Sequence, residues 1–396
     1  MTEPRTTLAL EPGRHKRAAG GHPWVYSNEI RMDAAAKALP PGSLVQLDAA
    51  DGRALGVATF NPHTLVAARI LDRDPGRAID EAFFAERLER ALALRQRLYD
   101  EPYYRLVHAE ADGLPGLVAD RFGDALVLQL NTAGMAKLAP VIVSAARAVL
   151  APRAIVLRND ATARAAEGLA AEAQVAFGEI AGPVEVRENG VRFLADALGG
   201  QKTGWFYDQR DNRRFMARLA RGCRVLDLYC YGGGFAVAAA AAGAADVLGL
   251  DRAEGALALA ARAAELNGVA ATCRFARGEI FAELEKRGAA GERFDVVIAD
   301  PPAFVKSRKD LGAGLRGYRK LARLAVGVAA PRGMLFIASC SHNVSGEDFA
   351  EAVRRGLLDA ERQGRILRSA GAAPDHPVHP ALPESAYLKS LTLALD

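Results

Sequence analysis

From about residue 200 onward, short apolar runs alternate with longer segments in which apolar residues recur at helical spacing. This alternation predicts buried parallel strands joined by helices, as in a doubly wound α/β sheet. Ligands of such sheets bind beyond the carboxyl ends of the strands. We expect seven strands, near residues 224–228, 246–251, 272–276, 294–299, 333–339, 365–370 and 387–395.

The chain before this region shows two other patterns. Residues 1–75 hold short alternating runs at 44–47 and 55–60, separated by turn signals, and predict a small β-barrel. Residues 76–182 predict a central α+β domain. We expect its helices at 79–98 and 134–149, and its strands at 105–108, 117–119, 125–130 and 154–157. A hairpin that turns at Asn189-Gly190 opens the third domain, residues 183–396.

Composition narrows the class of protein. Half of the residues are hydrophobic and 25% are charged, which is typical of a globular protein, and a net charge of +4 permits a polyanionic partner without requiring one. The four cysteines form no CxxC pair, which favours a reducing, cytoplasmic location. The N-terminus lacks the apolar core of a signal peptide, and the most apolar stretch, 235–245, is too short to span a membrane. The seven histidines do not cluster with other ligands, so we expect no metal site.

Two predicted strands end in carboxylates beside a glycine-rich loop. Asp227 ends the first strand, in the sequence RVLDLYCYGGGF, and Asp251 ends the second. Glycines at the start of a helix let the backbone approach a ligand closely, and a carboxylate at the second strand end can accept both hydrogen bonds of a ribose diol. Enzymes that bind dinucleotides carry GxGxxG at this position, which is absent here. Glu279, after the third strand, can meet an adenine amino group, although helix capping would also place an acid there.

The fourth strand ends in Asp300-Pro301-Pro302-Ala303-Phe304. The prolines predict a stiff, extended backbone past the strand end. In this position Asp300 can hydrogen-bond a base edge and Phe304 can stack on a flipped-out ring. A basic segment that includes Lys306, Arg308 and Lys309 follows and suits a phosphate backbone, unless it is only a solvated loop.

A second basic segment lies near the N-terminus. Arg14 and Lys16 precede Trp24 there, in the sequence GRHKRAAGGHPWVYSNEI. Cations that meet phosphates and rings that stack on bases are what an RNA-binding surface needs. A solvated basic turn followed by a core tryptophan would give the same pattern.

Cys340 stands between two serines where the fifth predicted strand ends. Free cysteine is a common packing residue, so the pattern alone favours packing over a nucleophile. The other three thiols, Cys223, Cys230 and Cys273, we interpret as packing residues.

Several motifs, in a fixed order along nearly the whole chain, carry a resemblance to a known family. They are GGHPWVYSNEI, DGLPGLVADRFGD, TGWFYDQRDNR, VLDLYCYGGGF, DPPAFVKS, GYRKL and SCS. The chain resembles the bacterial class I S-adenosylmethionine-dependent 23S rRNA (cytosine-5) methyltransferases of the RlmI type, which combine a PUA domain with a Rossmann-like methyltransferase domain.

The resemblance implies S-adenosyl-L-methionine as the cofactor and large-subunit ribosomal RNA as the partner. It implies that Cys340 adds to carbon 6 of the target cytosine and that Asp300 assists at the ring nitrogen. The implied cofactor-binding residues are Asp227, Tyr229, Gly232, Gly234, Asp251, Glu279, Asp300, Asp208, Gln209 and Arg210. The implied RNA-binding residues are Pro301, Phe304, Lys306, Arg308, Lys309, Arg14, Lys16 and Trp24.

Three alternatives remain open at this point. The enzyme could methylate carbon 5 of uracil or an exocyclic guanine amine, and an exocyclic amine requires no cysteine nucleophile. The chain could also be a non-catalytic RNA-binding factor in ribosome assembly. For Asp208 and its neighbours, composition alone leaves helix capping and surface charge open beside cofactor binding. The sequence leaves the oligomeric state open, including a homodimer.

Overall fold

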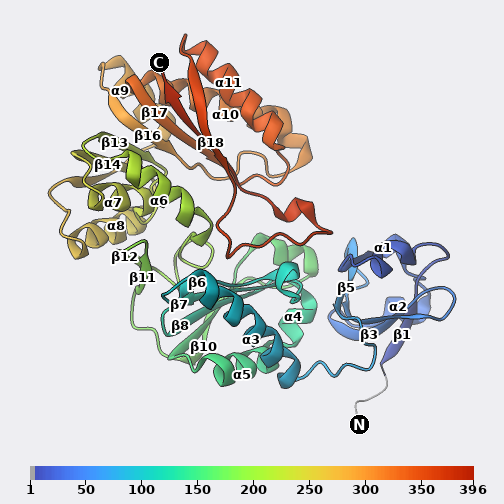
Figure 1. Ribbon diagram of the computed structural model, residues 1–396. Coiled ribbons are helices and arrows are strands. Elements are labelled where there is room, and N and C mark those ends of the chain that lie inside the picture. The colour runs from blue at the N-terminus through green and yellow to red at the C-terminus, as the bar shows by residue number, and fades with distance from the viewer. Residues whose placement is uncertain (1–4) are drawn as a thin grey trace. The chain divides into compact units, whose positions relative to one another are not determined.

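The computed structural model describes residues 5–396, so the first four residues of the predicted barrel 1–75 lie outside it. Figure 1 shows the arrangement of the elements. The chain forms two compact units. Unit 1 contains the chain through Val184 with Asp196–Trp205 and Asp375–Pro383, and unit 2 contains Glu185–Ala195, Phe206–Pro374 and Glu384–Asp396. Two short segments from the C-terminal half of the chain therefore pack with the N-terminal half.

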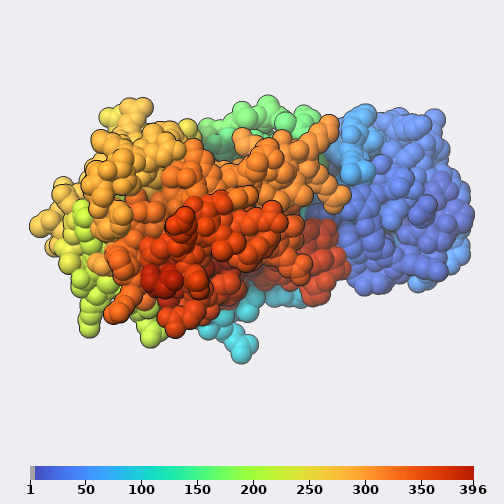
Figure 2. All heavy atoms as spheres, turned by 90° about the horizontal axis from the view of Figure 1, so that it is seen from above, coloured from blue at the N-terminus to red at the C-terminus, as the bar shows by residue number. Residues whose placement is uncertain are grey.

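The N-terminal part of unit 1 is a five-stranded barrel, as the sequence predicts. Its strands lie in the order β1-β3-β4-β5-β2, and a bridge between Leu10 and Ile30 joins the two ends of the sheet. Alternate residues of β3 are buried, and the barrel residues are the blue spheres in Figure 2. Its elements are β1 (Thr6–Ala9), α1 (His15–Ala19), β2 (Trp24–Tyr26), η1 (Ser27–Glu29), α2 (Ala34–Ala38), β3 (Ser43–Asp48), β4 (Ala54–Phe60) and β5 (Val66–Asp72).

The rest of unit 1 is a second five-stranded sheet, in the order β10-β9-β8-β7-β6, with helices packed on it. The predicted helix 134–149 is two helices, α4 and α5, because Pro140 lies in the first turn of α5 and cannot donate the hydrogen bond that a continuous helix needs. Its elements are α3 (Glu81–Leu98), β6 (Tyr103–His108), η2 (Ala109–Asp112), β7 (Leu117–Phe122), β8 (Ala125–Leu130), α4 (Ala133–Lys137), α5 (Ala139–Leu150), β9 (Ala154–Asn159), η3 (Thr162–Glu167) and β10 (Glu172–Gly178).

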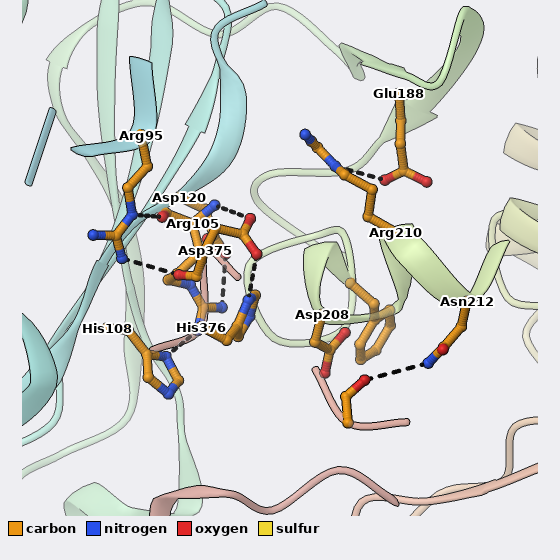
Figure 3. Close-up of polar contacts among 12 residues, drawn as sticks. Arg95, Arg105, His108, Asp120, Glu188, Asp208, Arg210, Asn212, Asp375 and His376 are labelled. Carbon is orange, nitrogen blue, oxygen red and sulfur yellow. Dashed lines mark hydrogen bonds and ion pairs between the residues drawn. The ribbon is translucent and has the colours of Figure 1, made fainter. Parts of the chain in front are cut away.

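A buried ionic network fixes the segment Asp375–Pro383 in unit 1 (Figure 3). The fully buried Arg95 donates two hydrogen bonds to Asp112, at 2.6 and 2.8 Å, and one to the Asp375 carbonyl at 2.9 Å. The Asp375 carboxylate accepts from the Arg105 backbone N–H at 3.0 Å and lies 2.8 Å from Nδ1 of His376. His376 is therefore buried in this network.

Unit 2 is a seven-stranded, doubly wound α/β sheet, as the sequence predicts. The strand order is β15-β14-β13-β16-β17-β19-β18, and β19 runs antiparallel to both of its neighbours. The strands are β13 (Arg224–Leu228), β14 (Asp246–Asp251), β15 (Cys273–Arg277), β16 (Phe294–Ala299), β17 (Ala329–Ser339), β18 (Gly364–Ala370) and β19 (Lys389–Leu395).

Helices cover both faces of this sheet, with α6, α7 and α8 grouped apart from α10 and α11 (Figure 1). The helical elements are η4 (Tyr207–Gln209), α6 (Arg210–Leu219), α7 (Gly234–Ala241), α8 (Glu254–Leu266), α9 (Ile280–Ala289), η5 (Arg308–Asp310), α10 (Leu311–Gly327), α11 (Gly346–Asp359) and η6 (Pro383–Ser385). Leu321 and Ala325 of α10 and Phe349, Val353 and Leu357 of α11 form a common core with the central strands. No helix within residues 5–396 is long and apolar enough to cross a membrane.

The predicted hairpin is β11 (Val184–Glu188) and β12 (Val191–Ala195). Asn189 and Gly190 both have positive φ, at 54° and 78°, which suits the two-residue turn that the sequence predicts. At the end of β11, Glu188 accepts hydrogen bonds at 2.5 and 2.7 Å from Arg213 of α6. Burial alone would lower the pKa of Arg213, but the Glu188 carboxylate more than offsets this effect and raises it. The pair is thus a buried salt bridge that connects the hairpin to α6, the helix that precedes the first strand of the sheet.

Replacing Glu188 with alanine should destabilise unit 2 by about 3–5 kcal/mol, because it leaves the Arg213 charge buried without its carboxylate partner. Both side chains are at most 4% exposed. Glu185→Ala is the matched control, since Glu185 lies on the same hairpin and pairs with the half-exposed Arg187 and Arg192. We expect the control to cost less than about 1 kcal/mol in urea-induced unfolding. Equal losses in the two variants would contradict the assignment.

Candidate active site

Four neighbouring parallel strands, β14, β13, β16 and β17, bring their carboxyl ends to one edge of the sheet. Asp251 ends β14, Asp227 is the penultimate residue of β13, Asp300 follows β16 and Cys340 follows β17. The register pairs Leu228 with Ala299, and Ala299 with Ile337. Residues that are far apart in the sequence are therefore placed at one edge.

The glycine-rich loop after β13 has an unusual backbone. Tyr229 and Tyr231 have positive φ, at 60° and 47°, and Gly233 has φ of 77°. Left-handed conformations cost energy for residues other than glycine and recur at functional sites. Asp251 compensates this cost in part, because its Oδ2 accepts the Tyr231 N–H at 2.9 Å. The Asp251 side chain thus stabilises the glycine-rich loop, and it can do so while it also binds a ligand.

Gly233, which the sequence analysis passed over in favour of Gly232 and Gly234, is a constrained glycine of this loop. It is the N-cap of α7, and a β-carbon there would lie 2.8 Å from Cβ of Ala260 and 3.2 Å from the ring of Phe275. Positive φ and lack of space both require glycine at this position.

Asp227 is buried, and its Oδ2 accepts the Ala236 N–H of α7 at 2.9 Å. Its Oδ1 is buried and has no hydrogen-bond partner among residues 5–396. Burial raises the pKa of Asp227 well above its usual value, and the charges of Asp300 and Asp251 raise it further. A cationic ligand at this edge would stabilise the carboxylate and satisfy Oδ1. S-adenosylmethionine carries a sulfonium and an ammonium group, so the donor set at this edge fits it.

Glu279 lies on the exposed start of α9, and its Oε2 accepts the Ala282 N–H at 2.9 Å. Helix capping, the alternative raised by the sequence, is thus what this carboxylate does in the structure. Burial raises the pKa of Tyr229, and the nearby Glu279 carboxylate raises it further. The two side chains therefore lie close together, and a role for Glu279 at an adenine amino group stays a prediction.

Asp208, Gln209 and Arg210 are buried in unit 2, rather than exposed on its surface. Asp208 accepts a hydrogen bond from the Tyr387 hydroxyl at 2.5 Å, and Gln209 accepts one from Asn212 at 2.7 Å. Figure 3 shows Arg210 directed toward Glu188, with 3.7 Å between Nε and Oε2. No side chain caps α6, so the capping alternative does not account for Asp208.

The Asp-Pro-Pro segment lies directly on α10. A β-carbon at Gly314 would lie 2.1 Å from Cγ2 of Val305, and one at Gly317 would lie 3.0 Å from the Phe304 ring. Phe304 is half-buried, with its ring centroid 4.7 Å from that of Tyr318, while Pro301 is buried. The glycines of α10 thus provide the space that this segment occupies.

The two serines around Cys340 have a shared structural role. Ser339 donates a hydrogen bond to the Tyr318 hydroxyl at 2.8 Å, and the same hydroxyl lies 2.9 Å from Oγ of Ser341. Ser341 also accepts the Val305 N–H at 3.3 Å. Both serines are buried, whereas Cys340 is partly exposed. The Tyr318 hydroxyl therefore fixes the backbone on both sides of Cys340 and leaves the thiol accessible.

The other three thiols are unsuited to attack. Burial raises the pKa of Cys273 to about 12 and that of Cys230 well above its usual value. Cys223 precedes β13, at the opposite end of that strand from the site, and burial raises its pKa too. A thiol must ionise to act as a nucleophile. These positions agree with the interpretation of the three as packing residues.

The basic segment after the Asp-Pro-Pro motif divides into two sets. Lys306, Arg308 and Lys309 are exposed. Arg319 and Lys320, further along the chain in α10, instead pair with Asp359 at 2.6 Å and Glu285 at 3.0 Å. The first set therefore matches the expectation of a phosphate-binding surface better than the second.

In the barrel, Arg14 and Lys16 are exposed around α1. The Trp24 indole N–H donates to Glu110 of η2 at 2.8 Å, so this ring is partly committed to packing within unit 1. Within residues 5–396, no group of three or more potential ligands is placed to hold a metal ion.

Gly233→Ala should weaken cofactor binding and lower stability by at least about 1–2 kcal/mol, because it forces a side chain into a left-handed, filled position. Gly255→Ala is the control, since nothing lies within 4 Å of the new carbon in the first turn of α8. Calorimetric titration with S-adenosylmethionine and thermal unfolding would measure both effects. Unchanged affinity in Gly233→Ala would remove this loop from the cofactor site.

Comparison with known proteins agrees with this geometry. Residues 135–390 match the family model of S-adenosylmethionine-dependent methyltransferases, and residues 8–73 match that of PUA-like domains. The chain is 37% identical to ribosomal RNA large subunit methyltransferase I of Shewanella denitrificans, covering 97% of this chain and 98% of that protein. It is also 37% identical to the protein of the same name from Cronobacter sakazakii, over 96% and 97% of the two chains.

Two solved structures share the fold. A SAM-dependent methyltransferase from Streptococcus mutans superposes with a TM-score of 0.81 at 21% identity, covering 98% of this chain and all of that one. A methyltransferase complexed with SAH superposes with a TM-score of 0.83 at 20% identity, over the same shares of the chains. The fold, the fit of the glycine-loop edge to the cofactor and the near full-length matches together show that the chain belongs to the S-adenosylmethionine-dependent methyltransferase family of ribosomal RNA large subunit methyltransferase I.

Proposed function

We propose that this protein methylates carbon 5 of a cytosine in large-subunit ribosomal RNA through a covalent adduct at Cys340. The observation that carries the proposal is that Cys340, a partly exposed thiol, lies between two buried serines at the carboxyl edge of the sheet. The names of the relatives support ribosomal RNA as the substrate. The PUA-like match supports RNA binding by the N-terminal barrel.

The chemistry requires a nucleophile because carbon 5 of cytosine attacks poorly. When bound, S-adenosylmethionine supplies a methyl group on a sulfonium. In the proposed reaction the Cys340 thiolate forms a bond to carbon 6, while Asp300 hydrogen-bonds or protonates the ring nitrogen. Carbon 5 then has enamine character and accepts the methyl group. Loss of the carbon 5 proton to a base and of the thiolate from carbon 6 restores the aromatic ring.

Asp300 is suitably placed for this role because it follows the strand next to that of Cys340. It is partly buried, and its charge raises the pKa of the neighbouring Asp227. Asp251 accepts the Tyr231 N–H of the glycine-rich loop with Oδ2 and the Ala253 N–H with Oδ1, and it would accept the ribose hydroxyls with its remaining lone pairs.

Covalent trapping tests the nucleophile. RNA with 5-fluorocytosine at the target should form an adduct that survives denaturing electrophoresis, because fluorine cannot leave as a proton does. We expect formation of the adduct to require S-adenosylmethionine and the adduct to contain the Cys340 peptide. Cys340→Ser should abolish it while retaining cofactor binding, because a hydroxyl ionises far less than a thiol.

Cys230→Ser is the matched control and should still trap the RNA, because Cys230 is buried with a raised pKa. Turnover on ordinary RNA without any adduct in the wild type would instead favour an exocyclic amine as the target. Failure to bind S-adenosylmethionine would favour a non-catalytic RNA-binding role.

The exposed basic loop should bind the RNA backbone. Replacing Lys306, Arg308 and Lys309 together with alanine should reduce the slope of log affinity against log salt by about one unit per lost phosphate contact. Arg319→Ala with Lys320→Ala is the control, since both cations already pair with carboxylates. A slope that falls equally in both variants would show only a general effect of net charge. Cofactor affinity should not change in either variant.

A further inference from the structure

Lys389, the first residue of β19, is held against the turn that carries Cys340. Its Nζ donates hydrogen bonds to the carbonyl oxygens of Ser341 at 2.8 Å and Val344 at 2.7 Å. The sheet register pairs Lys389 with Ser339, the residue before Cys340. The two hydrogen bonds therefore fix the ammonium group against the turn that carries Cys340. The β-ladder fixes the backbone of Lys389 beside Ser339.

This arrangement is unusual for a lysine, because a mobile surface side chain would place its charge in water. Burial lowers the pKa of Lys389, whereas the thiolate form of Cys340 raises it. The two groups are thus close enough to interact electrostatically. Since such an interaction is mutual, a positive charge on Lys389 favours ionisation of Cys340.

We propose that Lys389 is the cation that activates Cys340, because its ammonium group stabilises the thiolate on which the proposed methyl transfer depends. The catalytic use of the thiolate rests on the proposed function. The interaction between Lys389 and Cys340 does not, because it is a property of the protein without RNA or cofactor. In the activation step the Cys340 S–H bond breaks, the proton passes to solvent, and the electron pair remains on sulfur beside the Lys389 charge.

Other groups near the thiol do not supply this charge. Burial raises the pKa of Tyr318, so its phenol stays neutral while it holds the two serines. Asp300 is an acid and therefore cannot supply a positive charge in either protonation state. The His342 ring is tilted by 33° against that of Tyr387, with 5.3 Å between the ring centroids, and its Nδ1 lies 3.3 Å from the Glu384 carbonyl oxygen. Lys306 is exposed, and its charge is screened by water.

The matched pair of variants is Lys389→Gln and Lys389→Arg. Glutamine keeps N–H donors for the two carbonyl oxygens but loses the charge, whereas arginine keeps the charge. The readout is the pH dependence of Cys340 alkylation by iodoacetamide in the full-length protein without RNA, followed by mass spectrometry of the Cys340 peptide. Cys340→Ser gives the background from Cys223, the other partly exposed thiol.

Removing a cation from beside a thiolate raises the thiol pKa. We expect Lys389→Gln to shift the midpoint of alkylation upward by about one pH unit, so that alkylation near neutral pH falls about tenfold. Lys389→Arg should stay near the wild-type profile. Arg365→Gln is a control for net charge, since Arg365 pairs with Ala394 at the opposite end of β19.

An alkylation profile that is unchanged in Lys389→Gln would overturn the inference. Equal losses in the glutamine and arginine variants, with a matching drop in unfolding temperature, would also overturn it and leave Lys389 a structural role. The outcome is independent of the proposed function, because alkylation needs neither RNA nor cofactor. If Cys340 is the nucleophile and Lys389 activates it, covalent trapping of 5-fluorocytosine RNA by Lys389→Gln should recover when the pH is raised by one unit.

Discussion

The parallel register of β14, β13, β16 and β17 is the constraint on which the site depends. Parallel strands in a doubly wound sheet all present their carboxyl ends at the same edge, so each loop that leaves the sheet there adds one chemical group. Asp251, Asp227, Asp300 and Cys340 meet in this way, although long stretches of chain separate them. A change in strand order would remove a group from the edge without altering the sequence of any motif.

Carboxylates that lie close together at one edge repel one another, and this repulsion acts most strongly on Asp227. Asp227 is the most buried of the three acids, and its pKa is raised by burial and by its two neighbours. Arg213 partly offsets this repulsion, since its charge lowers the pKa of Asp227. Glu188 in turn holds Arg213 in place. The carboxylates are therefore held in position before a positively charged cofactor binds, which is electrostatic preorganisation.

The thiol side of the edge is organised by one phenol. The Tyr318 hydroxyl contacts Ser339 and Ser341 and accepts the Phe304 N–H at 3.4 Å, so it links the turn after β17 to the Asp-Pro-Pro segment after β16. Glycines on α10 let this segment approach the helix that carries Tyr318. Cys340 and Asp300 are thus positioned by shared packing, which explains why the serines around the cysteine are polar yet buried.

The sequence by itself determined the fold class, the seven strands of the last sheet and the chemical groups at their ends. These follow from local signals, namely apolar periodicity, turn residues and motif order. Such signals can be recognised in a sequence without knowledge of the tertiary contacts. Only the tertiary structure decided the partners of those groups. It showed that Gly233 has no room for a side chain, that Glu279 caps a helix, and that Trp24 donates a hydrogen bond to Glu110. It also joined Lys389 to the Cys340 turn across the antiparallel β19, a contact between residues nearly fifty positions apart that no local pattern encodes.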